Sequence, residues 1–167
     1  MKEALINYIQ SVKNDELYTP EIAVLPLLKY LPKNKIIWEC TDYGSSKITK
    51  ILRDNGFKVI STHKREFDFL EDIPDFEFDI IITNPPYSIK DDFIEKCYSY
   101  GKPFALLLPI HALEGKRRGA LYRKHGLELL VLDKRINYIK SKKSNWFNTS
   151  WFCYQILPDK LIFEEVK

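Results

Sequence analysis

The sequence predicts an α/β domain built on a mainly parallel, doubly wound sheet with helices on both faces. From residue 35 onward, short apolar runs alternate with segments of helical periodicity. The run FDIIIT at 78–83 is predominantly apolar, which is typical of a strand covered on both faces. With 167 residues, of which 45% are hydrophobic, the chain is long enough to bury one core. We therefore expect a single domain, with an N-terminal helical segment at 1–34 and an α/β core at 35–167.

The N-terminal segment carries two predicted helices. Apolar residues recur at every third or fourth position of 4–12, which favours a helix. A second helix is predicted within 18–32, with Thr19 as its N-cap and Pro20 at its first helical position. Pro26 is expected to break or kink this second helix.

The α/β core begins with a strand–helix–strand unit. KIIWE at 35–39 predicts a strand, and FKVIST at 57–62 predicts a second one. The helix between them, at 45–56, has a serine at its start and Gly56 as its stop signal. Its expected inward-facing residues are Ile48, Ile51 and Leu52.

The alternation continues through the middle of the chain. After the strand at 78–83, residues 90–101 predict a helix whose first turn is acidic, which suits the helix dipole. A strand at 102–109 and a helix at 111–126 follow.

The predicted sheet ends in an antiparallel pair. Two apolar runs at 127–139 and 151–157 predict strands with no helix between them, so they can pair antiparallel at one edge of the sheet. The other crossovers predict parallel strands, and ligands of such sheets bind beyond the carboxyl ends of the strands.

One of these strand ends carries the motif NPPY. Asn84 directly follows the strand at 78–83, and the two prolines keep the chain extended beyond it. The side-chain oxygen of Asn84 and the carbonyl of Pro85 can then both accept hydrogen bonds from one external group. Tyr87 supplies a flat apolar face beside them. The simpler interpretation is a proline-stiffened exit loop with an incidental tyrosine.

Two acceptors beside an aromatic ring suit an exocyclic amino group on a planar base. The lone pair of an adenine amino group is delocalised into the ring, and accepting both N–H bonds localises it and stabilises the positive charge that develops during attack. An electrophilic methyl group held in line about 3–3.5 Å away would complete a displacement. A base in a duplex would first have to be flipped out.

The net charge of +3 conceals a strongly basic segment. Residues 1–114 carry a net charge of −4, whereas residues 115–143 carry +8. Lysines and arginines alternate there with aromatic residues, a pattern typical of nucleic-acid binding, although a solvated face is the plainer interpretation. The candidates for contact with nucleic acid are Arg117, Arg118, Arg123, Lys124, Arg135, Lys140, Lys142, Lys143 and Trp146.

Several aromatic and histidine residues allow two interpretations. Trp146 can either stack on a base or cover the edge of the sheet, and both interpretations stay open. For Trp151 we expect a place in the core. His111 follows a predicted strand end, where it either lines the site or begins a helix.

Other features exclude several classes of protein. Cys40, Cys97 and Cys153 are far apart, which argues against a disulfide framework or a zinc site and favours a reducing, cytoplasmic environment. The three histidines show no metal-ligand spacing, so we expect no metal. We see no apolar run of membrane-spanning length and no secretory signal.

The motif NPPY after an apolar strand resembles the catalytic motif of S-adenosylmethionine-dependent amino-methyltransferases that act on adenine N6, and in particular the small, phage-type enzymes. The likeness covers most of the chain and implies a Rossmann-like methyltransferase fold. It implies catalytic roles for Asn84, Pro85, Pro86 and Tyr87. It also implies S-adenosylmethionine as cofactor and DNA or RNA as partner.

Further segments extend the resemblance to the cofactor site. LYTP at 17–20 is similar to the family's N-terminal cofactor-binding element, IIWECTDYGSSK at 36–47 stands where its cofactor loop belongs, and FDFL at 67–70 matches its Asp-Phe segment. The residues implied to bind the cofactor are Tyr18, Thr19, Pro20, Glu39, Asp42, Gly44, His63, Asp68 and Phe69.

The chain departs from the family pattern at two places. The cofactor loop of the family is glycine-rich, but here Asp42 and Tyr43 accompany a single glycine, Gly44. The family places an acid at the end of the second strand, where this chain has His63, which can still hydrogen-bond a ribose. Glu39 can compensate by binding the methionine ammonium group, or it is a plain strand-end residue.

Three functions therefore remain open. The first is N6-methylation of adenine in DNA or RNA. The second is a degenerate relative that binds nucleic acid or a protein without the cofactor, as the altered loop would allow. The third is methylation of protein glutamine, which uses the same motif but is typical of chains with a longer helical N-terminal domain. The oligomeric state is not predicted.

Overall fold

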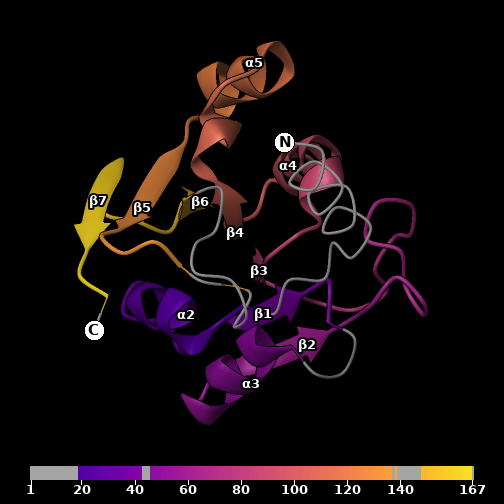
Figure 1. Ribbon diagram of the computed structural model, residues 1–167. Helices are drawn as coiled ribbons and strands as arrows, with labels where there is room; N and C mark the ends of the chain where they lie inside the picture. The colour runs from indigo at the N-terminus through magenta and orange to yellow at the C-terminus, as the bar shows by residue number, and fades with distance from the viewer. Residues whose placement is uncertain (1–18, 43–45, 137, 139–147, 167) are drawn as a thin grey trace, which may run out of the picture.

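The computed structural model describes residues 19–42, 46–136, 138 and 148–166, and the predicted helix at 4–12 lies outside these ranges. A seven-stranded sheet runs through the molecule in the order β2-β1-β3-β4-β6-β5-β7 (Figure 1). Its strands are β1 (Ile36–Glu39), β2 (Lys58–Ser61), β3 (Ile80–Thr83), β4 (Phe104–Pro109), β5 (Glu128–Leu132), β6 (Thr149–Tyr154) and β7 (Leu161–Glu164).

The sheet is mostly parallel, as predicted. β1 pairs parallel with β2 and β3, β3 with β4, and β5 with β7. β6 runs antiparallel to both β4 and β5, which confirms the predicted antiparallel pair. β6 is inserted between its two partners, and β7, which the sequence analysis missed, forms the outermost strand.

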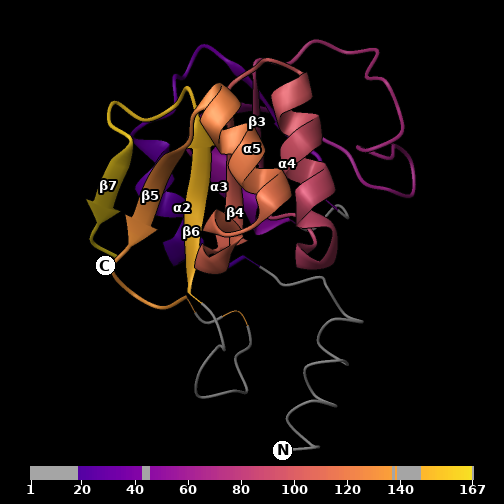
Figure 2. The same cartoon turned by 90° about the horizontal axis from the view of Figure 1, so that it is seen from above.

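Helices cover both faces of the sheet. α2 (Glu21–Leu28) and α3 (Lys47–Asp54) lie on one face, whereas α4 (Lys90–Ser99) and α5 (Lys116–His125) lie on the other (Figure 2). Short 3₁₀ helices at Tyr87–Ile89 and Ile110–Leu113 follow β3 and β4. The helix predicted at 111–126 is therefore divided, because Gly115 adopts a φ of +131° before α5 begins.

Alternation along the strands divides the core into two layers. Ile80 and Ile82 of β3 pack with α2 and α3, whereas Ile81 packs with α4. β6 follows the same rule, since Trp151 faces the first layer and Phe152 the second. Trp151 is fully buried and donates a hydrogen bond of 2.7 Å from Nε1 to the carbonyl of Ala23, which confirms its predicted place in the core.

Local signals explain the ends of the helices. The hydroxyl of Ser46 accepts a hydrogen bond from the Thr49 amide at the start of α3, and Gly56 has the positive φ expected of its stop. The predicted cap at Thr19 is wrong, since Pro20 occupies the N-cap position of α2 and makes no side-chain cap. α2 also continues through Pro26 to Leu28, so the expected break at Pro26 is wrong. Among the described residues, no helix is long and apolar enough to cross a membrane.

Candidate functional site at the carboxyl ends of β1 and β3

The site begins where two adjacent parallel strands end. β1 and β3 are paired through Trp38 and Ile81, so the next residues of both strands reach the same edge of the sheet. There the side chain of Glu39 meets that of Thr83. In open α/β sheets this edge is where ligands bind.

Glu39 lies at the centre of a buried hydrogen-bond network. Its Oε1 accepts from the Thr83 hydroxyl at 2.6 Å, from the Thr41 amide at 3.0 Å and from the Thr41 hydroxyl at 2.9 Å. The two threonine hydroxyls are themselves 2.6 Å apart. The network therefore joins the first residues of the loop after β1 to the last residue of β3.

The electrostatics of Glu39 are set by burial. Glu39 is 1% exposed, and loss of hydration raises the pKa of its carboxyl group, while hydrogen bonding by Thr83, Thr41 and Ser46 acts in the opposite direction. Its second oxygen, Oε2, is buried and accepts no hydrogen bond from the residues that the structure describes. Buried polar atoms in proteins are nearly always hydrogen-bonded, so this oxygen calls for an explanation.

Asn84 is oriented by Thr19. The Nδ2 of Asn84 donates a hydrogen bond of 3.0 Å to the Thr19 hydroxyl, across 65 residues of sequence. The amide group is planar, so this bond also fixes the direction of Oδ1, the acceptor that the sequence analysis assigns to a substrate amino group. Two segments that the sequence analysis linked by resemblance alone, LYTP and NPPY, are thus in contact.

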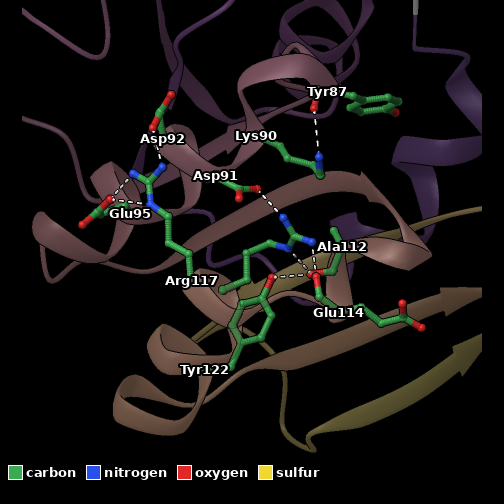
Figure 3. Close-up of polar contacts among 10 residues, drawn as sticks. Tyr87, Lys90, Asp91, Asp92, Glu95, Ala112, Glu114, Arg117 and Tyr122 are labelled. Atoms are coloured by element: carbon green, nitrogen blue, oxygen red, sulfur yellow. Dashed lines mark hydrogen bonds and ion pairs between the residues drawn. The ribbon is translucent and has the colours of Figure 1, made fainter.

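The rest of the motif turns sharply into a helix. Pro85 is buried, Pro86 and Tyr87 are half-buried, and a 3₁₀ turn over Tyr87–Ile89 leads into α4. Lys90 closes this turn by donating from Nζ to the carbonyl of Tyr87 at 3.2 Å (Figure 3). Burial raises the pKa of Tyr138 to about 12, while the neighbouring side chains of Thr149 and Tyr87 act in the opposite direction.

Two polar atoms of the motif are covered by neighbouring groups. Oδ1 of Asn84 and the hydroxyl of Tyr87 are both buried in this structure. A base can therefore reach Oδ1 only after the groups that cover it shift.

Asp42 stabilises the loop that follows β1. Its backbone amide donates to the Thr62 carbonyl at 2.9 Å, and its Oδ1 accepts from the Ser46 amide at 2.7 Å. Asp42 is 6% exposed, so its carboxylate is buried inside the loop, where it holds the backbone in place. Gly44 and Tyr18 lie outside the described residues, and their predicted roles stay predictions.

His63 and Asp68 lie in the segment that follows β2. The pairing of β1 with β2 continues past the strand ends through Thr62, which brings His63 next to the segment of Asp42. The half-buried His63 accepts a hydrogen bond at Nδ1 from the Arg65 amide at 3.2 Å. Asp68 is also half-buried and accepts from the Leu70 amide at 3.0 Å.

Phe69 lies in the hydrophobic core. It is 2% exposed, stacks on Phe93 with ring centroids 5.0 Å apart and contacts Trp38 edge-on. In this structure Phe69 therefore offers almost no surface to a cofactor. Pro20, by contrast, is half-buried beside Thr19.

The five predicted nucleic-acid residues that the structure describes divide into three groups. Arg117 (Figure 3) and Arg118 pair with acids of α4, Arg123 and Lys124 are exposed in the last turn of α5, and Arg135 donates to Asn148 at 2.8 Å. Four further candidates, Lys140, Lys142, Lys143 and Trp146, lie outside the described residues.

The arginine pairs reduce the basic character of α5. Arg117 contacts Asp92 at 2.8 Å and also pairs with Glu95, while Arg118 contacts Asp91 at 2.5 Å. These two arginines thus connect α5 to α4, and these ion pairs compete with the contacts to nucleic acid that were predicted for them.

Three residues of the site were missed by the sequence analysis. Thr41 and Thr83 complete the network of Glu39, and Lys90 secures the turn after the motif. The available signal was the polar end of the otherwise apolar run IIIT, since a threonine at a buried strand end needs a polar partner. His111 is exposed in the 3₁₀ helix after β4. No cluster of three metal-binding side chains occurs among the residues described.

Comparison with solved structures identifies the fold. The chain is similar to the methyltransferase subunit of a type I restriction-modification system from Streptococcus thermophilus, with a TM-score of 0.56 and 15% identity over 90% of this chain and 47% of that one. A modification subunit ascribed to a type I restriction enzyme of Vibrio vulnificus YJ016 gives a TM-score of 0.58 and 11% identity over 99% of this chain and 50% of that one. The fold is that of a Rossmann-like methyltransferase.

The chain spans about half the length of these solved structures. No protein-family model matches it, and neither does any curated protein. The likeness establishes the fold, and the function must be argued from the site.

Proposed function

We propose that this protein transfers a methyl group from S-adenosylmethionine to the N6 amino group of adenine in DNA or RNA. The observation that carries the proposal is the hydrogen bond from Asn84 to Thr19 at the carboxyl end of β3. It orients the first residue of NPPY beside the end of β1, where methyltransferase folds hold their cofactor. The two similar structures belong to restriction-modification systems, which favours DNA as the first substrate to test.

The residues at the end of β1 suit the cofactor. S-adenosylmethionine carries a cationic ammonium group, and Oε2 of Glu39 is a buried acceptor that the described residues leave without a donor. His63 can hydrogen-bond the ribose, and Asp68 lies in the segment that would approach the adenine ring of the cofactor. When bound, the cofactor would supply the electrophilic methyl group.

The motif would act on the target amino group. Oδ1 of Asn84 and the carbonyl of Pro85 would accept its two N–H bonds and increase its nucleophilicity. Tyr87 would stack on the base through its ring. No strong base is needed, because the methylated ammonium is acidic enough to lose its proton readily.

The decisive experiment uses labelled S-adenosylmethionine with mixed DNA and RNA. The intact protein should transfer label to adenine, and Asn84→Ala should lower kcat by about 100-fold or more while the Kd for the cofactor stays within about threefold. Asn55→Ala is the matched control, since Asn55 lies at the end of α3 and bonds the Ile51 carbonyl, and it should keep full activity. Cofactor binding without methyl transfer to any nucleic acid would refute the proposal.

A second candidate is a relative that binds nucleic acid or a protein without using the cofactor. The observation that favours it is the bond between Asp42 and the Ser46 amide, which places a buried carboxylate inside the cofactor loop. Calorimetric titration with S-adenosylmethionine separates the two candidates. Micromolar binding would dispose of this second candidate, whereas absence of binding would favour it over the first.

A further inference from the structure

β7 ends the sheet with an exposed apolar surface. Phe163 is 70% exposed and Leu161 is 53% exposed, and both side chains point to the face that carries α4 and α5. Figure 2 shows that these helices cover the middle of the sheet, while β5 and β7 extend beyond α5. Two large apolar side chains on an outermost strand are a liability unless another strand covers them.

The backbone of β7 has its own directional pattern. The carbonyls of Lys160 and Glu164 accept hydrogen bonds from Leu129 and Asp133, so the residues at 160, 162 and 164 face β5. Because the direction alternates along a strand, the amides and carbonyls of Leu161 and Phe163 face outward. Among the described residues, no strand pairs with this outer edge.

The opposite edge of the sheet is protected in a way that β7 is not. At β2, the guanidinium of Arg53 donates to the outward carbonyl of Val59 at 3.0 Å. A charged side chain over an outward carbonyl blocks the approach of another strand. The β2 edge of the sheet is thus partly blocked by a charged side chain, whereas the β7 edge exposes apolar side chains.

We propose that β7 is a self-association edge, at which two copies of this chain pair antiparallel about a two-fold axis through Ile162. In this register Leu161 of each copy lies opposite Phe163 of the other, and these are the two residues whose backbone groups face outward. Their exposed side chains would then cover one another on one face of the sheet. A two-fold axis produces both contacts at once.

The same register matches charges on the other face. Lys160 would lie opposite Glu164 of the second copy, twice per dimer. Glu164 uses its Oε1 to accept from Tyr30 and to pair with Lys29 at 2.5 Å, so these two interactions leave its Oε2 available to Lys160 of the second copy. Lys160 is exposed. Self-complementary charge, apolar contact and backbone direction therefore agree on one register and on one occupant, a second copy.

The register can be tested by cross-linking. Ile162→Cys would place two thiols across the axis at a non-hydrogen-bonded pair, where Cα atoms are about 4.5 Å apart and a disulfide can form. The native Cys40, Cys97 and Cys153 are all buried, so they should not compete. Lys160→Cys is the matched control, because its two copies would be about 14 Å apart in this register.

The expected result is a concentration-dependent dimer in analytical ultracentrifugation and rapid oxidative cross-linking of Ile162→Cys, but not of Lys160→Cys. Phe163→Lys should weaken self-association at least about tenfold, with an unchanged circular dichroism spectrum because Phe163 is an exposed residue. A chain that stays monomeric up to near-millimolar concentration would overturn the proposal. So would a dimer that forms equally well with Phe163→Lys, or in which both cysteine variants cross-link alike. None of these outcomes depends on methyl transfer.

Discussion

At the scale of single residues, Glu39 concentrates the polar interactions of the site. One of its oxygens accepts three hydrogen bonds, and the other accepts none among the described residues. A carboxylate in this position costs stability when it is charged, since burial raises its pKa. The protein keeps an acid where a neutral amide could accept the same three bonds. An acid at this position is what the proposed binding of the cofactor's ammonium group requires.

Glu39→Gln should change how stability depends on pH. Above the ordinary glutamate pKa of 4.5, the unfolded chain has released the proton of Glu39, while the folded protein retains it up to its raised pKa. The folded state then binds more protons, so its free energy of unfolding falls as pH rises through this window.

Glutamine does not titrate, so the variant should gain stability relative to the parent as pH rises above the ordinary glutamate pKa of 4.5, until the raised pKa of folded Glu39 is passed. Urea unfolding across this range measures the difference. A difference that stays constant with pH would contradict the burial of a titrating carboxyl group at this position.

The meeting of Asn84 with Thr19 marks a limit of sequence reasoning at this scale. The string NPPY identified Asn84, because two prolines directly after an apolar strand hold the preceding residue extended at the edge of the sheet. Thr19 was given the wrong physical role, since a threonine before a proline is also a good helix cap. The local signal could not reveal a partner 65 residues away, and the helix begins one residue later than predicted, with Pro20 at its N-cap position.

At the scale of elements, α4 and α5 are joined by two unequal arginines. The side chain of Arg118 is 13% exposed and reaches Asp91 and the carbonyl of Ala112 at 2.9 Å. The side chain of Arg117 is 49% exposed and pairs with Asp92 and Glu95 at the surface. Gly115 belongs to this arrangement, since a Cβ at that position would lie 2.6 Å from Nη2 of Arg118.

We expect the two arginines to differ in their effect on stability. Arg118→Ala removes charge-assisted hydrogen bonds from a mostly buried group and should lower the free energy of unfolding by about 1.5–3 kcal/mol. Arg117→Ala removes exposed pairs that are screened by solvent, and it should cost less than about 1 kcal/mol. Chemical denaturation of both variants measures the contrast. Equal losses of unfolding free energy in the two variants would mean that the burial of Arg118 does not determine how much it stabilises the protein.

Prediction succeeded for the elements where pattern and chemistry agree. The serine cap and the glycine stop of α3, and its buried Ile48, Ile51 and Leu52, were all predicted from the sequence. β7 was missed because its four residues follow a proline and an acid and lack a buried face, so neither alternation nor length distinguishes them from a loop. These residues form a strand because they pair with β5, and such pairing cannot be recognised from the sequence of the segment itself.

At the scale of the whole molecule, the three cysteines report on global unfolding. Cys40, Cys97 and Cys153 are at most 2% exposed, and burial raises the pKa of each thiol. Reactive thiolate should therefore appear only when the core opens. In native buffer, a thiol reagent should react slowly, at a rate that rises with denaturant in step with the unfolded fraction, and all three thiols should then react together. Fast reaction of one thiol in native buffer would contradict this.

The position of β6 between β4 and β5 has a consequence for how the protein folds. β6 fills the gap between β4 and β5 but is encoded after both of them. Until β6 docks, β4 and β5 each present an apolar strand with an unpaired edge on the side where β6 belongs. A folding intermediate that lacks β6 can therefore pair these strands with the wrong neighbour, and chaperones would be needed most at that stage.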